Sequence, residues 1–164
     1  MQQRVQALAT RFAEVNKAID LLAEHCTAVQ WQTSCATEGW SIGVTVHHVA
    51  NGYDQEGWVA ALIDAILGGQ ALPEHPSALY PERDYNQWHA EHFANCSQEE
   101  TLALLRRNGA AVLRLIEGLQ DEDLERTAPD SDNDMVSVQE AIEQIIIDHA
   151  QEHLKSLQAT LENG

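Results

Sequence analysis

The stretch Asp148-His149-Ala150-Gln151-Glu152-His153 lies inside the last predicted helix, which runs from Ser137 to about Glu162. Ser137 and Glu140 form a capping-box pattern that marks its start. Apolar and polar residues then recur at steps of three and four, which places them along one face: Val138, Ile142, Ile145, His149, His153, Ser156 and Thr160. Both histidines therefore occupy positions typical of core residues, and at a spacing of four their rings can converge on one ion. A third ligand must come from elsewhere in the chain.

Length and composition indicate one all-α domain over residues 1–164. With 164 residues, of which 44% are hydrophobic, the chain is long enough for one domain with a core and too short to expect two domains. Its four prolines and nine glycines favour helices over short strands.

The charge balance excludes two classes of partner. Nine basic and 26 acidic residues give a formal net charge of -17, which repels nucleic acid and anionic lipid surfaces. The N-terminal sequence has no long apolar run, and no segment reaches the length of a membrane span, so we expect a soluble, cytoplasmic protein. Cys26, Cys35 and Cys96 are widely spaced and predict reduced thiols rather than disulfides or a zinc knuckle.

Three more helices precede the last one. The first runs from near the start to about Ala28, the second from Ser41 to Leu67, and the third from Ser97 to Gly118. A connection of about 27 residues, Gln70 to Cys96, with a short helix around Asp84 to Ala94, joins the second to the third. Because it can cross the length of a bundle, the third helix need not run antiparallel to the second. We predict four helices around one core.

The second helix supplies the third histidine. His48 is in phase with its apolar side, whereas His47 falls toward the edge. If the helices run up, down, down, up, the second and fourth are antiparallel, and helix rise alone puts His48 and His153 at similar levels, roughly 10 and 13 Å from the same end. Three imidazoles on Zn²⁺ would leave a coordination position for water or substrate.

Other interpretations of these histidines stay open. The three could be neutral, hydrogen-bonded core residues, and His89 with His92 forms another spacing suited to a ligand pair.

The acidic stretch from Pro129 to Asp134 lacks the glycine and bidentate glutamate of a calcium loop, and is interpreted as a solvated loop. Carboxylates or amides near the histidines in sequence are candidates to orient the rings: Asp148, Glu152, Gln55 and Glu56.

These residues resemble the DinB-like family. The segment from Trp40 to Asn51 is similar to its Trp-Ser-(six residues)-His-Leu-Ala-Asp pattern, with His48 at the family histidine, and His149 and His153 match its His-x-x-x-His. Gln120-Asp121-Glu122-Asp123-Leu124 extends the similarity beyond the third helix. Asn51 stands where the family usually has Asp, and the Gly-Gln commonly found after the last histidine is missing.

The resemblance implies a DinB/YfiT-like four-helix bundle, up-down-down-up, with a long crossover between helices 2 and 3. It also implies one divalent metal, often zinc or nickel, held by three histidines, and frequently a homodimer. Members of the superfamily include S-transferases that use bacillithiol, mycothiol or glutathione, and a mycothiol-dependent maleylpyruvate isomerase.

Three functions are compatible with this resemblance. The first is a thiol-dependent S-transferase or detoxification enzyme, with a small thiol and an electrophile as its ligands. Aromatic residues near that end could line its pocket, and few cations are available to bind the thiol's carboxylates: Trp31, Trp40, Tyr53, Tyr80 and Trp88, with Arg83, Arg106 and Arg107. The second is a non-catalytic, metal-stabilised binding or stress-response module. The third is a metal-assisted hydrolase with Glu152 or Glu56 as general base.

Overall fold

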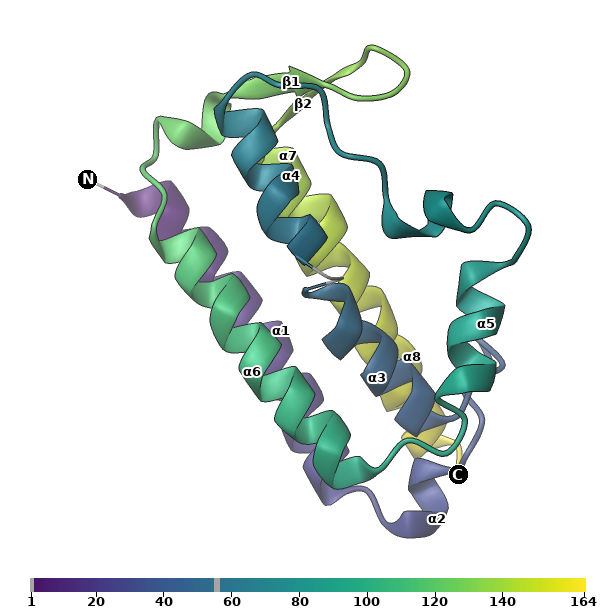
Figure 1. Cartoon of the computed structure of the whole chain (residues 1–164). Coiled ribbons are helices and arrows are strands. Elements are labelled where there is room, and N and C mark those ends of the chain that lie inside the picture. The colour runs from purple at the N-terminus through teal and green to yellow at the C-terminus, as the bar shows by residue number, and fades with distance from the viewer. Residues whose placement is uncertain (1, 55–56) are drawn as a thin grey trace.

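The computed structural model describes residues 2–54 and 57–164, and its architecture is a bundle of four long helical segments (Figure 1). The bundle is formed by α1 (Gln3–His25), α3 (Ile42–Gly52) with α4 (Trp58–Leu67), α6 (Gln98–Glu117), and a last segment of α7 (Val138–Glu140), a π-helical stretch (Ala141–Asp148) and α8 (His149–Glu162). The short α2 (Ala28–Trp31) follows α1 after Thr27, whose hydroxyl caps it.

The helices follow the up-down-down-up order. In Figure 1, α1 runs away from the end where the N-terminus lies, α3 and α4 return, α6 runs parallel to α3 and α4, and the last segment runs parallel to α1. The connection that makes this order possible contains a 3₁₀ helix (Pro76–Leu79) and α5 (Tyr85–His92). It crosses the length of the molecule beside α3 and α8. The predicted four-helix bundle is therefore confirmed.

The second helix is not continuous, which corrects the prediction of one helix from Ser41 to Leu67. Ser41 caps α3 as expected, but α3 ends at Gly52 and α4 begins only at Trp58. The N–H of Gly57 bonds to both the carbonyl and the side chain of Asp54, and Gly57 is the N-cap of α4 with φ +83°, a left-handed value outside the α-helical range. Among the described residues, the α-helix is therefore interrupted by a turn at Tyr53 and Asp54 and by Gly57.

The last helix contains a wider turn than predicted. Between Ala141 and Asp148 the helix is π-helical, with hydrogen bonds that span one residue more than in an α-helix. The residues that face the core therefore differ from those expected for an α-helix: Ile145 is only partly buried, whereas Ile146 and Ile147 are buried. Val138 and Ile142 remain buried, as the α-helical period predicts.

The core lies between the helices. Buried core residues of α1 and α6 are Val5, Leu8, Phe12, Val15, Ile19, Leu102, Leu105, Val112 and Ile116. Burial of this apolar surface, at about 25 cal/mol per Å², is what stabilises the bundle.

The predicted acidic loop is the tip of a small hairpin. Strand β1 (Thr127–Pro129) pairs antiparallel with β2 (Met135–Ser137). Asp130 accepts backbone hydrogen bonds from Asp132 and Asp134, at 2.9 Å each, so its carboxylate closes the turn. The sequence pattern did not predict these two strands.

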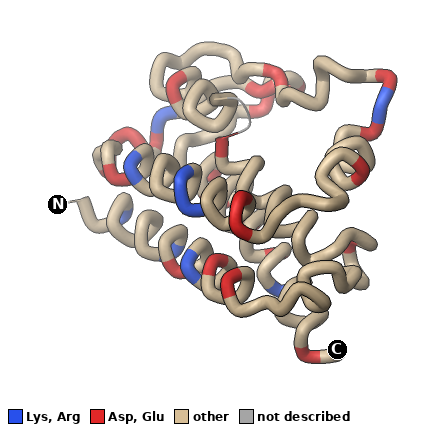
Figure 2. Tube along the Cα trace, turned by 60° about the horizontal axis from the view of Figure 1, so that its bottom comes forward, with Lys and Arg blue, Asp and Glu red and all other residues tan. Residues whose placement is uncertain are grey.

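The surface is acidic over most of the fold. Figure 2 shows acidic positions on many elements and few basic ones, several of which lie beside acidic positions. Arg4 pairs with Glu125, and Arg106 pairs with Asp20 and Glu24. None of the described helices is long and apolar enough to cross a membrane.

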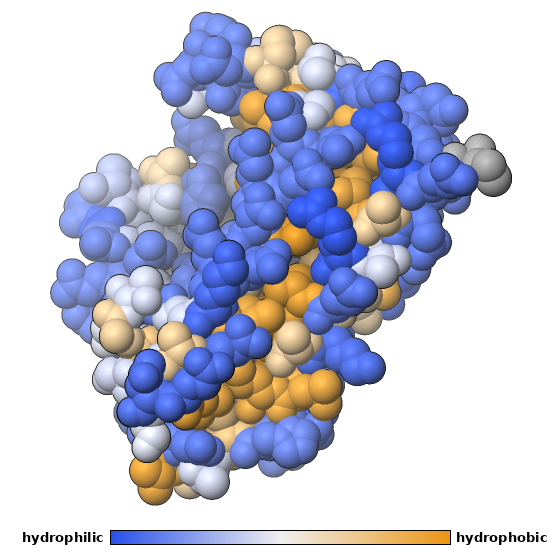
Figure 3. All heavy atoms as spheres, turned by 180° about the vertical axis from the view of Figure 1, so that it is seen from behind, coloured by the Kyte–Doolittle hydropathy of each residue, from blue (hydrophilic) through white to orange (hydrophobic). Residues whose placement is uncertain are grey.

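Some apolar side chains reach the surface. Figure 3 shows them in a band between polar side chains on the face seen from behind. The large exposed hydrophobic residues of the described chain are Leu21, Val29, Leu79, Tyr80 and Met135. They come from several elements, as is normal for a folded domain.

Candidate metal centre

The three predicted histidines meet between α3 and α8. One ligand nitrogen from each of His48, His149 and His153 lies within 4.8 Å of the other two. Nε2 of His149 is 3.3 Å from Nε2 of His48 and 3.2 Å from Nε2 of His153. No other set of three such side chains in the described part of the chain has this geometry.

Helix geometry explains how the rings converge. His149 and His153 are one turn apart at the start of α8, and α3 packs against α8 so that His48 faces them. All three rings pack edge to face, with centroids 4.7–5.2 Å apart. His48 is only 9% exposed.

Glu38 orients one of these rings. Nδ1 of His153 donates to a carboxylate oxygen of Glu38 at 2.9 Å, and the Ser156 hydroxyl donates to the other oxygen at 2.5 Å. A neutral ring that donates from Nδ1 leaves Nε2 as a lone pair, directed toward His149. The Glu38 side chain is 8% exposed, so water competes little for this contact.

The sequence pattern had indicated other residues as candidates to orient the histidine rings. Asp148 is 54% exposed on its side chain and lies 3.8 Å from Arg11, and Glu152 is exposed. Gln55 and Glu56 lie outside the described residues. Glu38 was missed because it comes from the loop before α3, and its only signal in the sequence is its place two residues before Trp40.

Burial keeps the rings of His48 and His149 neutral. Desolvation, followed by the nearby His153 and His149, lowers the pKa of His48 to about 2. Desolvation, followed by His153 and His75, lowers the pKa of His149 to about 4. Neutral imidazole is the form that binds a metal ion.

The separations of these nitrogens fit a divalent ion. Bonds of about 2.0–2.1 Å around a tetrahedral zinc ion put neighbouring nitrogens about 3.3 Å apart. Two of the separations at this site are 3.2 and 3.3 Å. Imidazole also suits nickel. The donor atoms and their spacing are therefore those of a three-histidine metal site with further coordination positions left over.

His47 and His89 form a second pair, and the His89 ring packs edge to face against His48 with centroids 5.4 Å apart. Nδ1 of His47 lies 3.0 Å from Nε2 of His89, and His47 is only 8% exposed rather than at the edge as predicted. Burial, with His47 and His92 nearby, lowers the pKa of His89 to about 4. His92 instead stacks on Trp88. The structure therefore does not bring His89 and His92 together as a ligand pair.

A small cavity opens beside His149. Its volume is about 260 Å³, and its other lining residues are Gly52, Trp58, His75, Gln144 and Ile145. His75 comes from the long connection and had not been singled out in the sequence. We call this space the His149 cavity.

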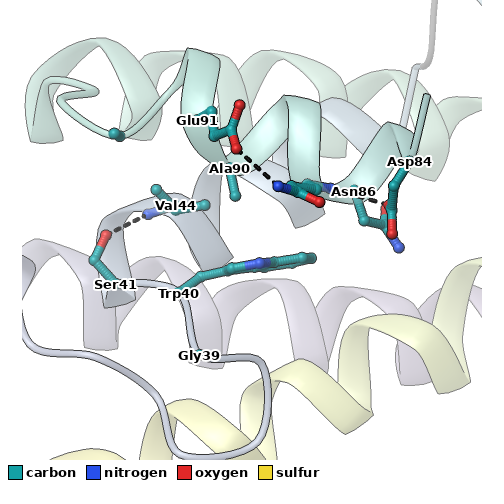
Figure 4. Close-up of a pocket in the computed structure, with 10 residues that line it drawn as sticks. Gly39, Trp40, Ser41, Val44, Asp84, Asn86, Ala90 and Glu91 are labelled. Atoms are coloured by element: carbon teal, nitrogen blue, oxygen red, sulfur yellow. Dashed lines mark hydrogen bonds between the residues drawn. The ribbon is translucent and has the colours of Figure 1, made fainter.

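A larger cavity of about 480 Å³ lies between α5 and the start of α3. Figure 4 shows the ring of Trp40 extended beneath α5, with Ala90 and Asn86 across from it. The same ring packs against His48 and His153, with centroids 5.1 and 6.5 Å away. Trp40 thus separates this cavity from the histidines.

The other predicted pocket residues lie elsewhere. Trp31 is buried and donates to the carbonyl of Cys96, and Tyr53 packs against Phe12 in the core. Tyr80 is exposed, and Arg83 lies over its ring. The aromatic wall of the His149 cavity is Trp58, which was not predicted.

Fold and site together define a four-helix bundle with three histidines converging on one point. The family model of the DinB superfamily matches residues 11–157, so the chain belongs to that superfamily. Among solved structures it is similar to YfiT from Bacillus subtilis, described as a probable metal-dependent hydrolase with an unusual four-helix bundle topology. The identity is 16% and the TM-score 0.72, over 99% of this chain and 89% of that chain. No curated protein matches this chain.

Proposed function

We propose that this protein is a metal-dependent enzyme that binds one divalent ion, zinc or nickel, through His48, His149 and His153. The observation that carries the proposal is the convergence of three histidine ring nitrogens at ion-binding distances beside a cavity. A bound divalent ion supplies positive charge that lowers the pKa of a thiol or water molecule and so provides a nucleophile at neutral pH.

The chain's own residues prepare this site. Glu38 fixes the orientation of the His153 ring, and burial keeps His48 and His149 unprotonated. Trp58 and Ile145 give the His149 cavity apolar walls for the organic part of a substrate.

The reaction we propose is thiol-dependent S-transfer. The sulfur of a low-molecular-weight thiol forms a bond to an electrophilic carbon, a leaving group departs, and the thiol proton passes to solvent. A water nucleophile needs a general base within reach, but the described lining of the His149 cavity contains no carboxylate, and Nδ1 of its His75 already accepts from the backbone N–H of Ser77. Glu152, the proposed base of a hydrolase, is exposed on α8. These observations favour a thiol over water.

A non-catalytic module would have a closed metal site. The cavity that His149 lines argues for access by a small molecule instead. Hydrolysis is the second candidate, because the similar structure of YfiT is described as that of a probable metal-dependent hydrolase.

Parallel assays on metal-loaded protein test this proposal. We expect the protein to join bacillithiol, mycothiol or glutathione to a chromogenic aryl halide, and the H149A variant to lose this activity. The H25A variant replaces an exposed histidine at the end of α1 and should match wild type. Hydrolysis of aryl esters without any thiol, together with no thiol transfer, would instead support the hydrolase.

The oligomeric state stays a prediction. The family resemblance implies a homodimer, which analytical ultracentrifugation would detect as a species of about twice the 18.2 kDa chain mass. A single species at the chain mass across micromolar concentrations would contradict it.

A further inference from the structure

His75 is held in a fixed position at the edge of the His149 cavity. The indole nitrogen of Trp58 donates to the carbonyl of Pro73 at 3.2 Å, which ties the long connection to α4. The Trp58 ring also packs edge to face against His75, with centroids 4.9 Å apart. His75 then caps the 3₁₀ helix that begins at Pro76. The edge-to-face contact and the cap restrict the ring, and the bond to Pro73 holds the backbone two residues before it.

These contacts also determine where the His75 ring carries its proton. The backbone N–H of Ser77 donates to Nδ1 of His75 at 3.1 Å, and the Ser77 hydroxyl lies 2.7 Å from the same nitrogen. A nitrogen that accepts from a backbone N–H has no proton of its own in the neutral ring. The proton is therefore on Nε2, which has no hydrogen-bond partner among the described residues.

The walls of the cavity complete a small binding site. Gly52 leaves space next to His149, since a Cβ there would lie 3.8 Å from His149 Cε1. Trp58 and Ile145 are apolar, and no described lining residue carries a negative charge, although the whole chain has a formal net charge of -17. The cavity is thus suited to an apolar body with one acceptor group.

We propose that the His149 cavity binds a small organic carboxylate, with one oxygen accepting from Nε2 of His75 and the apolar part against Trp58 and Ile145. This inference rests on the proposed function, because the metal held by the three histidines supplies the positive charge that attracts the carboxylate. The substrate would then be an organic carboxylate, and His75 would bind and orient that substrate.

A carboxylate titration tests this assignment. The protein is loaded with Co²⁺, whose visible absorption reports on ligands near the ion, and benzoate is added. H75F removes the donor, whereas H75Q places an amide N–H near the position of Nε2. H25F makes the same change at the exposed, distant His25. Cobalt content is measured for every variant.

We expect H75F to weaken benzoate binding about tenfold or more, since a hydrogen bond to a charged group is lost. H75Q should stay within about threefold of wild type, H25F should equal it, and all four proteins should hold equal cobalt. Unchanged affinity in H75F, or equal weakening in H75Q, would overturn the role of His75. Loss of cobalt from H75F would also overturn it, by making His75 part of the metal site. Wild type that holds no metal would instead refute the proposed function itself.

Discussion

Glu38 decides how the His153 ring is presented. Its two oxygens accept from His153 and Ser156, so the carboxylate is fixed from both sides. A carboxylate behind a ligand histidine raises the basicity of the ring and holds its tautomer. The metal affinity should therefore depend on a residue that would not touch the ion.

We predict that Glu38→Ala lowers the affinity for zinc about 10- to 100-fold, because the His153 ring loses its anchor. Competition with a zinc-binding dye measures the change. Glu152→Gln, an exposed carboxylate one residue before His153, is the matched control and should leave the affinity unchanged. Equal affinities in wild type and Glu38→Ala would show that the contact has no part in metal binding.

The buried histidines make the metal-free protein sensitive to acid. The pKa of His149 and that of His89 are lowered from 6.5 to about 4, and that of His48 to about 2. Between pH 6.5 and 4 the unfolded chain binds protons that the folded chain does not, so stability falls as the pH falls through this window. Each such group contributes about 1.4 kcal/mol per pH unit there.

We therefore expect the urea midpoint of metal-free protein to be lower at pH 5.5 than at pH 7.5. His89→Gln removes one of these groups and should reduce the pH dependence, whatever it does to stability at pH 7.5. A midpoint independent of pH would contradict the low pKa values.

At the scale of single residues, helical phase and the family resemblance together singled out His48, His149 and His153, whose ring nitrogens the fold brings within 4.8 Å of one another. Their spacing and apolar neighbours are local properties of the sequence. Glu38 and His75 could not be found this way, because loop residues reach the site only through tertiary packing. Glu38 contacts His153, which lies 115 residues further along the chain, and local periodicity carries no information about contacts between such distant positions.

At the scale of elements, α3 is positioned by a close approach at Gly43. The Trp31 ring of the preceding segment lies against Gly43, where a Cβ would come 2.6 Å from Trp31 Cε2. Trp31 in turn donates to the carbonyl of Cys96, at the end of the long connection before α6. This contact joins α2, α3 and the end of the long connection.

We predict that Gly43→Ala destabilises the fold by about 1–3 kcal/mol, because the rigid indole must move. That change corresponds to a melting temperature about 2–12 °C lower for a chain of this size. Gly52→Ala on the same helix meets only an ordinary contact at 3.8 Å and should remain within about 1 kcal/mol of wild type. Equal melting temperatures for the two variants would contradict the close approach.

Element boundaries were predicted at Ser41 and Ser97, but missed at Thr27, whose capping box opens α2 inside the predicted first helix, and where the last helix changes type. Ser41, Asp84 and Ser97 each cap a helix by accepting from the backbone three residues on, as their positions in the sequence indicate. The π-helical stretch after Glu140 has the same apolar composition as an α-helix, so its extra residue per turn is set by packing and not by a sequence signal.

At the scale of the whole molecule, the long connection is what places the site. It lets α6 run parallel to α3, brings His89 to the ring of His48, and places His75 in the lining of the His149 cavity. Family resemblance and the length of the connection from Gln70 to Cys96 together predicted this topology. The cavities could not be predicted, because they depend on how the connection folds over α3, α4 and α8.

A metal ion bound to His48, His149 and His153 would link α3 to α8, so zinc should stabilise the whole bundle. We predict a gain of about 2.7 kcal/mol at a free zinc concentration 100 times the dissociation constant. The melting temperature should then rise by about 5–11 °C. His149→Ala should show no such rise, and an equal rise in both proteins would indicate zinc binding elsewhere.

The most direct test of the account is metal content, measured by elemental mass spectrometry on untagged protein purified without a nickel column. We predict close to one equivalent of zinc or nickel in wild type and in His25→Ala, and almost none in His48→Ala or His149→Ala. A folded wild type that is free of metal, resists reconstitution and gains no stability with added Zn²⁺ would contradict the three-histidine metal centre.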